Sequence, residues 1–155
     1  VEWQKLDVAA NSSFSFTFKL TIDKKPTKTQ KQWIVFHKGG TKEAVTPSLF
    51  VTTDKTLAFH ISNSEDIVTS DGTIEPKQEN TVACIIDQQA KEARLVVNGK
   101  TSKAQLPGEF TISEGSLNIA VSEHFPKKNY LIGSLSTFTV HHSALKDEEV
   151  AEIFK

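Results

Sequence analysis

The chain has 155 residues, of which 37% are hydrophobic and 24% are charged. This length fits one domain that buries roughly 70% of its unfolded surface, and the composition is that of a globular domain rather than a disordered or membrane-inserted one. Eighteen basic residues against 19 acidic ones leave a formal net charge of -1, which gives no overall positive field to attract nucleic acid.

The single cysteine, Cys84, excludes a disulfide within the chain and any CxxC zinc or redox motif. No apolar run approaches the roughly 20 residues that span a bilayer, so we expect no insertion into a membrane. The chain opens on Val1, contains no methionine and begins with no signal segment. We therefore expect residues 1–155 to form a single domain excised from a larger protein.

The first clear element is a strand. Apolar and polar residues alternate strictly from Ser13 to Asp23, with the apolar residues on one side and a solvent-facing polar side opposite. Shorter runs rich in β-branched and aromatic residues, separated by turn signals, predict further strands. They cover 32–38, 48–52, 56–62, 80–87, 93–97, 101–105, 116–122 and 133–141.

Turn residues indicate how some of these strands connect. Asn98-Gly99 predicts a type I′ hairpin, because both residues tolerate the positive φ that this turn requires. Asp54-Lys55 predicts a second tight hairpin, whereas 39–47 and 62–72 are expected to be long loops.

The only clear helix is at the end of the chain, over 147–154. Val150, Ile153 and Phe154 recur at helical spacing, and acidic residues fill the first turn, where the helix dipole favours them. We expect this helix to lie on the domain rather than inside it. Many short strands with one short helix predict an all-β, two-sheet antiparallel jelly-roll sandwich.

Several segments, taken in order, resemble the laminin-G-like jelly-roll domains of the concanavalin A-like lectin/glucanase superfamily. They are Phe14-Ser15-Phe16-Thr17-Phe18, the apolar strand at 33–39 that ends in Lys38-Gly39, the strand at 81–87, the hairpin at 93–100 with Asn98-Gly99-Lys100, and the ending at 131–150 that contains Gly133 and Ala144-Leu145. The match covers nearly the whole chain.

The resemblance implies a non-catalytic recognition module for glycans, cell-surface proteins or matrix components, at the cell surface or outside the cell. Relatives often hold one Ca²⁺. Ser136 and Thr137 replace the acidic residues of the family pattern, which removes oxygen ligands that Ca²⁺ prefers. We therefore expect no cofactor, and calcium is kept as an alternative. Lys146 stands where Ser or Thr usually caps the last helix, which should weaken the cap without altering the fold.

The sequence contains no strong catalytic or metal-binding pattern. Glycosidases on this sandwich use carboxylates at alternate positions of one strand, and none is present; Glu65 and Asp66 are consecutive, in a predicted loop. Cys84 lies in a strand that is apolar on both faces, which favours a buried, inert thiol. The weak candidates for a cation site are Asp66 and Asp71. We predict that the protein is not an enzyme.

Two segments suggest ligand binding. Lys24, Lys25, Lys28 and Lys31 form a basic loop, interpreted either as a solvated connection or as a site for an anionic glycan or acidic partner. The loop at 122–130 combines aromatic rings, an amide and cations, which suit sugar stacking and hydroxyl recognition. Its candidate ligand-binding residues are His124, Phe125, Lys127, Asn129 and Tyr130. Alternatively, the two rings simply pin the loop to the sandwich edge.

The leading hypothesis is thus a lectin-like module that binds a glycan or glycoprotein through rim loops. The first alternative is a protein-interaction or structural domain of a larger assembly, with cell adhesion as an example, which should expose an apolar patch of several hundred Å². The second is an accessory domain of an atypical glycoside hydrolase, which requires converging carboxylates. Nucleic acid is not an expected partner, and the sequence leaves the oligomeric state open.

Overall fold

The computed structural model describes residues 2–3, 13–38, 47–61, 67–106, 117–120 and 127–155. Its strands and helices, in chain order, have the following bounds. They are β1 (Glu2–Trp3), β2 (Phe14–Ile22), β3 (Gln32–Lys38), β4 (Ser48–Thr52), β5 (Leu57–His60), β6 (Ile67–Thr69), β7 (Asn80–Asp87), β8 (Glu92–Val97), β9 (Lys100–Gln105), β10 (Leu117–Ile119), the 3-10 helix η1 (Lys127–Asn129), β11 (Gly133–His141) and α1 (Asp147–Ile153).

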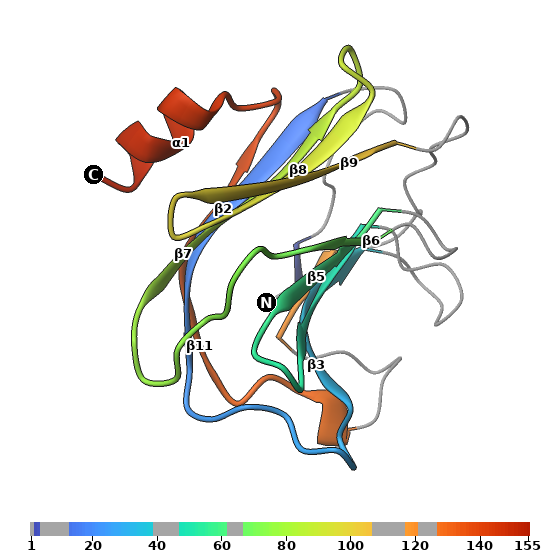
Figure 1. Ribbon diagram of the computed structural model, residues 1–155, viewed down its shortest axis with the longest axis vertical. Helices are drawn as coiled ribbons and strands as arrows, with labels where there is room; N and C mark the ends of the chain where they lie inside the picture. Colours follow the sequence, from blue (N-terminus) through green and yellow to red (C-terminus); the bar gives the residue numbers. More distant parts are fainter. Residues whose placement is uncertain (1, 4–12, 39–46, 62–66, 107–116, 121–126) are drawn as a thin grey trace.

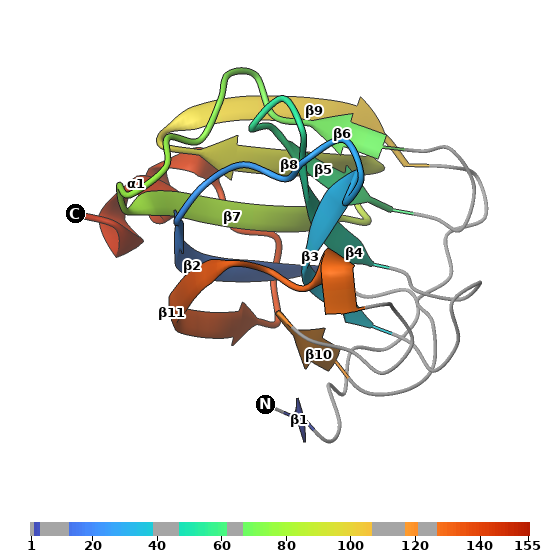
Figure 2. The same cartoon turned by 90° about the horizontal axis from the view of Figure 1, so that it is seen from below.

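The strands form two antiparallel sheets that pack face to face (Figure 1). One sheet has the order β1-β10-β3-β4-β5-β6, and the other has the order β11-β2-β7-β8-β9. Helix α1 lies on the outer side of the five-stranded sheet, away from the six-stranded one (Figure 2). The predicted jelly-roll sandwich with a short C-terminal helix is therefore confirmed.

The alternating residues of β2 supply the centre of the core. Phe14, Phe16 and Phe18 are at most 1% exposed, and in the antiparallel register they lie opposite Ile86, Cys84 and Val82 of β7. Edge-to-face, tilted and stacked contacts join Phe16 and Phe18 to Phe36 of the other sheet and to Phe138 of β11, at centroid separations of 5.2 to 6.2 Å. Such aromatic contacts stabilise the core beyond the burial of area alone.

The expectation that β2 has one solvent-facing side was wrong. Ser15 and Thr17 point to the outer face of the sheet, yet they are 0% and 1% exposed. The Ser15 hydroxyl donates to the carbonyl oxygen of Ser143 at 2.7 Å and accepts the N–H of Leu145 at 3.0 Å. The segment that leads to α1 therefore covers this face, and a small polar residue is buried because its hydrogen bonds are satisfied.

Helix α1 adds a second, smaller core on that outer face. Leu145 and Val150 pack with Ala83, Ile85 and Val96, all of them buried, which explains why β7 is apolar on both sides. Lys146 makes no side-chain cap, as expected, but its N–H donates to the Glu149 carboxylate at 3.1 Å. Within the described residues, no helical segment has the length and apolar character needed to cross a membrane.

Both predicted tight hairpins are confirmed. Asn98 and Gly99 have φ of 51° and 82° between β8 and β9, and Lys55, with φ of 62°, lies in the turn between β4 and β5. Treating 62–72 as one long loop was wrong, because β6 pairs with β5 along the sheet edge. A three-residue edge strand is too short to produce a recognisable period in the sequence.

Candidate functional site

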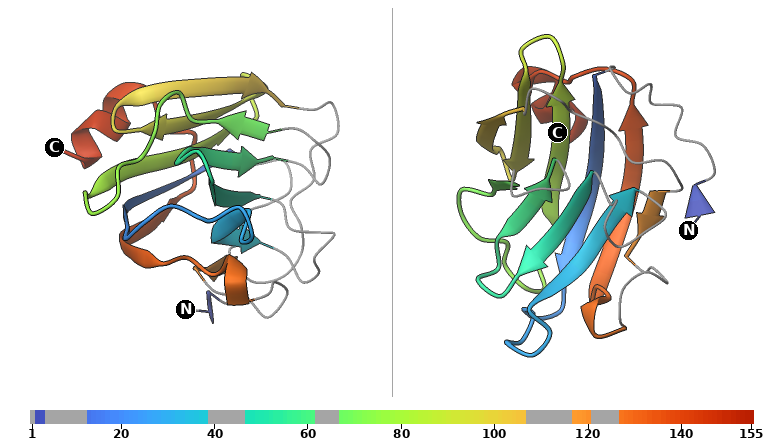
Figure 3. Two further views of the ribbon diagram at one scale, coloured as in Figure 1. Left: turned by 60° about the horizontal axis from the view of Figure 1, so that its bottom comes forward. Right: turned by 90° about the vertical axis from the view of Figure 1, so that its right-hand side faces the viewer.

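One end of the sandwich carries the connection between β2 and β3 together with helix η1. Figure 3 shows the two segments side by side in both views. The side-chain amide nitrogen of Asn129 in η1 donates to the carbonyl oxygens of Gln30 and Gln32, at 2.7 and 2.8 Å. The N–H of Asp23 donates to the carbonyl of Ile132 at 3.1 Å. Two backbone groups of this connection and one at the start of β3 are thus held by the segment around η1.

The β2–β3 connection is itself a closed turn. The Thr27 hydroxyl accepts the N–H of Gln30 at 3.2 Å, and the Gln30 side chain accepts the N–H of Thr27 at 3.0 Å. The N–H of Lys31 donates to the Thr27 carbonyl at 2.9 Å, and Lys31 adopts a φ of 67°. Reciprocal bonds of this kind fix a turn in the same way that a capping box fixes a helix start.

The structure describes three of the five predicted ligand-binding residues, and all three lie at this end. Lys127 is exposed, whereas Asn129 and Tyr130 are half-buried. Both hydrogen bonds that the Asn129 amide nitrogen donates go to backbone carbonyl oxygens. Tyr130 forms a parallel β-bridge with Ile34. The structure therefore gives Asn129 and Tyr130 positions that fix the rim. His124 and Phe125 lie outside the described residues.

The sequence analysis treated the lysines of the β2–β3 connection and those of η1 as separate features. The tertiary structure brings them to one end of the molecule, and their side chains are exposed. They are Lys24, Lys25, Lys28, Lys31, Lys127 and Lys128, and we call this set the basic end. Two short lysine-rich segments about 100 residues apart carry no local signal that they will meet.

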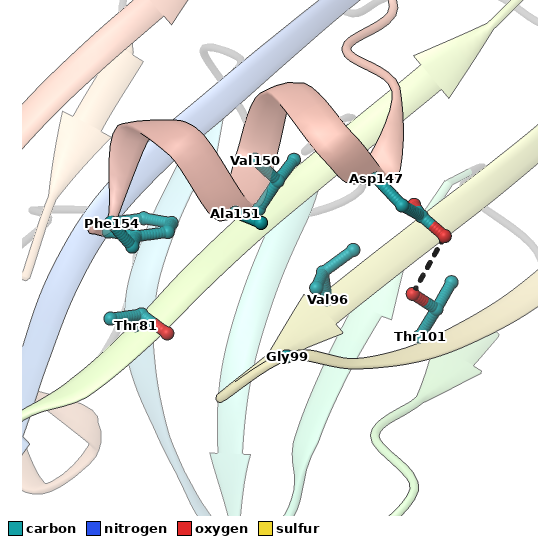
Figure 4. Close-up of a pocket in the computed structure, with 8 residues that line it drawn as sticks. All are labelled: Thr81, Val96, Gly99, Thr101, Asp147, Val150, Ala151 and Phe154. Atoms are coloured by element: carbon teal, nitrogen blue, oxygen red, sulfur yellow. Dashed lines mark hydrogen bonds between the residues drawn. The ribbon is translucent and has the colours of Figure 1, made fainter.

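A pocket of about 300 Å³ lies beneath helix α1, against the start of the β8–β9 hairpin (Figure 4). It is lined by Thr81, Val96, Gly99, Thr101, Asp147, Val150, Ala151 and Phe154. Asp147 supplies its single carboxylate, which accepts from Thr101 at 3.3 Å and from Arg94 at 2.6 Å. A pocket of this size suits a small ligand, but its carboxylate is already engaged in holding the helix.

The other residues that the sequence suggested for catalysis or cation binding are Cys84, Asp66 and Asp71, and the structure describes two of them. Burial raises the pKa of the Cys84 thiol well above its ordinary value, so the thiolate that chemistry would require is disfavoured. Asp71 is exposed, and its backbone N–H donates to Ser102 at 2.8 Å, whereas Asp66 lies outside the described residues. Across the described ranges, no three His, Cys, Asp or Glu side chains gather as a metal site would require.

The histidines are dispersed. His37 is fully buried at the end of β3, while His141 is half-buried and bonded to Thr17 at 2.8 Å. His60 packs edge-on against Phe50, with ring centroids 5.0 Å apart, and burial lowers the pKa of His60. These contacts fix side chains within the sandwich.

Comparison with known proteins agrees with this architecture. A laminin G-type family model, described as the concanavalin A-like lectin/glucanases superfamily, matches residues 1–151. A search among curated proteins found no match.

Solved structures show the same fold at low sequence identity. A heptameric SAP-like pentraxin from Limulus polyphemus has a TM-score of 0.74 and 17% identity, covering 96% of this chain and 72% of its own. The CBM40 of a Ruminococcus gnavus IT-sialidase, bound to α2,3-sialyllactose, has a TM-score of 0.72 and 16% identity, covering 94% and 84%. A Trypanosoma rangeli sialidase matches 93% of this chain with only 23% of its own length, at 13% identity and a TM-score of 0.72.

Proposed function

Because the chain belongs to the concanavalin A-like lectin/glucanases superfamily, we propose that it is a non-catalytic module that recognises a glycan or a glycosylated surface. One observation carries the proposal. The carbohydrate-binding module from Ruminococcus gnavus and this chain align over most of both lengths, whereas the Trypanosoma sialidase contributes only about a quarter of its chain. The shared part is therefore a whole binding module and a fraction of an enzyme. Fold alone does not fix function, so the site must carry the test.

We place the contact at the rim formed by the loop at 122–130. Lys127 offers an exposed cation there, and Tyr130 offers a half-buried ring. His124 and Phe125 complete the proposed contact, on the strength of their residue types and their place in the loop. Asn129 acts by positioning, because its amide holds η1 against the β2–β3 connection.

The described surface favours a glycan over a protein partner. A protein-binding domain is expected to expose a contiguous apolar patch, and in the described part of the chain Ile153, at 43% exposure, is the sole large hydrophobic side chain that is exposed. Glycan contacts rely instead on hydroxyls, cations and a few rings. The pocket beneath α1 has a single carboxylate, whereas glycoside hydrolysis uses two.

A thermal-shift series with a panel of neutral and acidic glycans tests the proposal, each glycan with added Ca²⁺ and with EDTA. A glycan at 100 times its dissociation constant stabilises the native state by roughly 2.7 kcal/mol. For a domain of this size we expect the melting temperature to rise by roughly 5 to 10 °C. No rise with any glycan would refute the lectin proposal, and a rise that EDTA removes would restore calcium as a cofactor.

A pair of aromatic variants tests the location. Phe125→Ala with Tyr130→Ala should abolish the glycan-dependent rise in melting temperature. The matched control is Phe154→Ala, which removes a half-buried ring from the pocket beneath α1 and should leave the rise unchanged. If the control loses binding and the double variant keeps it, the site lies beneath the helix and not at the rim.

A further inference from the structure

We infer that the ligand is an acidic polysaccharide, carrying carboxylate or sulfate groups, and that the basic end holds it. The inference rests on the proposed glycan-binding function and adds the chemical class of the glycan. The basic end comprises six lysines and, in the same two segments, one acidic residue, Asp23. The chain as a whole has a net charge of only -1, whereas these two segments hold six of its 18 basic residues and one of its 19 acidic ones, a clear local excess of positive charge.

The two lysine segments are held close together. Asn129 directly follows Lys128, and its amide reaches the carbonyls of Gln30 and Gln32, which flank Lys31. The backbones at Lys31 and Lys128 are therefore on the order of 10 Å apart, about two to three residue lengths. This separation is comparable to the Debye length of about 8 Å at physiological ionic strength, so one extended anion can come within range of charges from both segments.

The lysines of the basic end are accessible to an external anion. All six are exposed, and none forms an ion pair with an acid among the residues the structure describes. Two nearby acids, Glu75 and Glu79, pair instead with Lys55 at 3.3 Å and Lys19 at 3.5 Å. The positive charge of the basic end is thus not neutralised by these acids.

The backbone of the basic end is preorganised. The reciprocal bonds between Thr27 and Gln30, together with the left-handed φ of Lys31, fix the turn that presents Lys28 and Lys31. Pro26, which is buried, anchors the start of the turn. A preformed array of charges loses little conformational freedom on binding, which favours affinity.

The residue types favour a polysaccharide over a nucleic acid. The lysine ammonium is a point charge that can donate to carboxylate or sulfate oxygens from many directions, whereas base and phosphate recognition usually recruits arginine. Arg94 is the only arginine of the chain. In the described part of the basic end no aromatic ring is exposed, while single-stranded nucleic acids bind by stacking on such rings. Acidic sugar units repeated along a polymer can meet several separate lysines of two neighbouring segments.

The test compares three polymers on the whole 155-residue chain by titration calorimetry. Dextran sulfate and polygalacturonate supply sulfate and carboxylate, and neutral dextran shares its backbone with the first. We expect dextran sulfate or polygalacturonate to bind and neutral dextran not to bind, with an affinity that falls steeply as salt is raised. A single-stranded DNA of equal charge serves as competitor.

The triple variant Lys28→Gln, Lys31→Gln, Lys127→Gln should weaken binding of the acidic polymer by roughly tenfold or more. The matched control, Lys91→Gln, Lys103→Gln, Lys155→Gln, removes the same charge from exposed positions outside the basic end and should change the affinity less than about threefold. Equal losses in the two triple variants would overturn the inference, because only net charge would then matter.

The glycan panel, the polymer titrations and the triple variants together distinguish failure of this inference from failure of the proposed function. If neutral glycans of the panel bind and the triple variant has no effect, the chain is a lectin and the acidic-ligand inference is wrong. If DNA displaces the acidic polymer at equal charge, selectivity for polysaccharide is wrong. If no glycan of any kind binds, both the inference and the proposed function fail.

Discussion

Arg94 in β8 and Asp147 at the first position of α1 form an ion pair across 53 residues of sequence, with Nη1 and Oδ1 2.6 Å apart. The same guanidinium donates from Nη2 to the carbonyl oxygen of Leu145. Arg94 is 12% exposed, whereas Asp147 is 55% exposed. The guanidinium therefore acts as a largely covered clamp that fixes the start of the helix on the five-stranded sheet.

Replacing this clamp should loosen the helix. Arg94→Lys keeps a charge but cannot bond Asp147 and Leu145 together, so we expect the free energy of unfolding to fall by about 1 to 2 kcal/mol. Urea denaturation measures the change. The control is Lys155→Ala, which breaks a pair 3.6 Å apart whose partners are 78% and 74% exposed and should cost less than about 0.5 kcal/mol. Equal midpoints for Arg94→Lys and the wild type would contradict the clamp.

Gly133 permits the close approach of β11 to β2. A Cβ atom built at this position would lie 2.1 Å from the Thr21 carbonyl oxygen and 2.9 Å from the Ile22 Cα, both of which are backbone atoms. We expect Gly133→Ala to destabilise the domain by about 3 kcal/mol, because the strands must separate locally. A Cβ atom at Gly99 would have no atom within 4 Å, so the φ of 82° is the only source of strain. We therefore expect Gly99→Ala to lower the free energy of unfolding by about 1 to 2 kcal/mol. Chemical denaturation should rank the two variants in that order.

Two lysines occupy comparable left-handed positions, Lys31 directly before β3 and Lys91 directly before β8. Lys31 has a φ of 67° and Lys91 a φ of 56°, a region in which glycine is less strained. Replacement by glycine should leave stability unchanged or raise it by up to about 1 kcal/mol in both variants, after allowing for the added freedom of the unfolded chain. Lys31→Gly alone should weaken binding of dextran sulfate. Equal weakening by Lys91→Gly would show that position at the basic end does not matter.

Burial of His60 predicts a dependence of stability on pH. Its pKa lies below the ordinary value of 6.5 in the folded state, because desolvation disfavours the charged ring. The unfolded chain then binds more protons than the folded one below about pH 6.5, so the free energy of unfolding should fall as pH drops through this range. His60→Gln should flatten the decline, whereas His142→Gln, at an exposed position, should not. Denaturation midpoints between pH 7.5 and 5 measure both, and identical slopes would rule out this origin.

Local patterns predicted most of the fold. The strands at 32–38, 48–52, 80–87 and 133–141 have the expected bounds, and the Asn98-Gly99 turn and the C-terminal helix lie where the sequence placed them. These features depend on residues a few positions apart, since side-chain alternation and turn geometry are set by the neighbouring backbone. The family resemblance rests on the same local segments.

The candidate site was only partly accessible to such reasoning. The sequence identified the residue types at 127–130 and at 24–31, but Asn129 reaches Gln30 and Gln32 across 99 and 97 residues. The burial of Ser15 depends likewise on Leu145, 130 residues away. The sequence by itself determined the strands, the turns and the alternating core face. Only the tertiary structure decided which loops share an end and which outer face α1 covers, because strand order in the sheets, and not local periodicity, brings distant segments into contact.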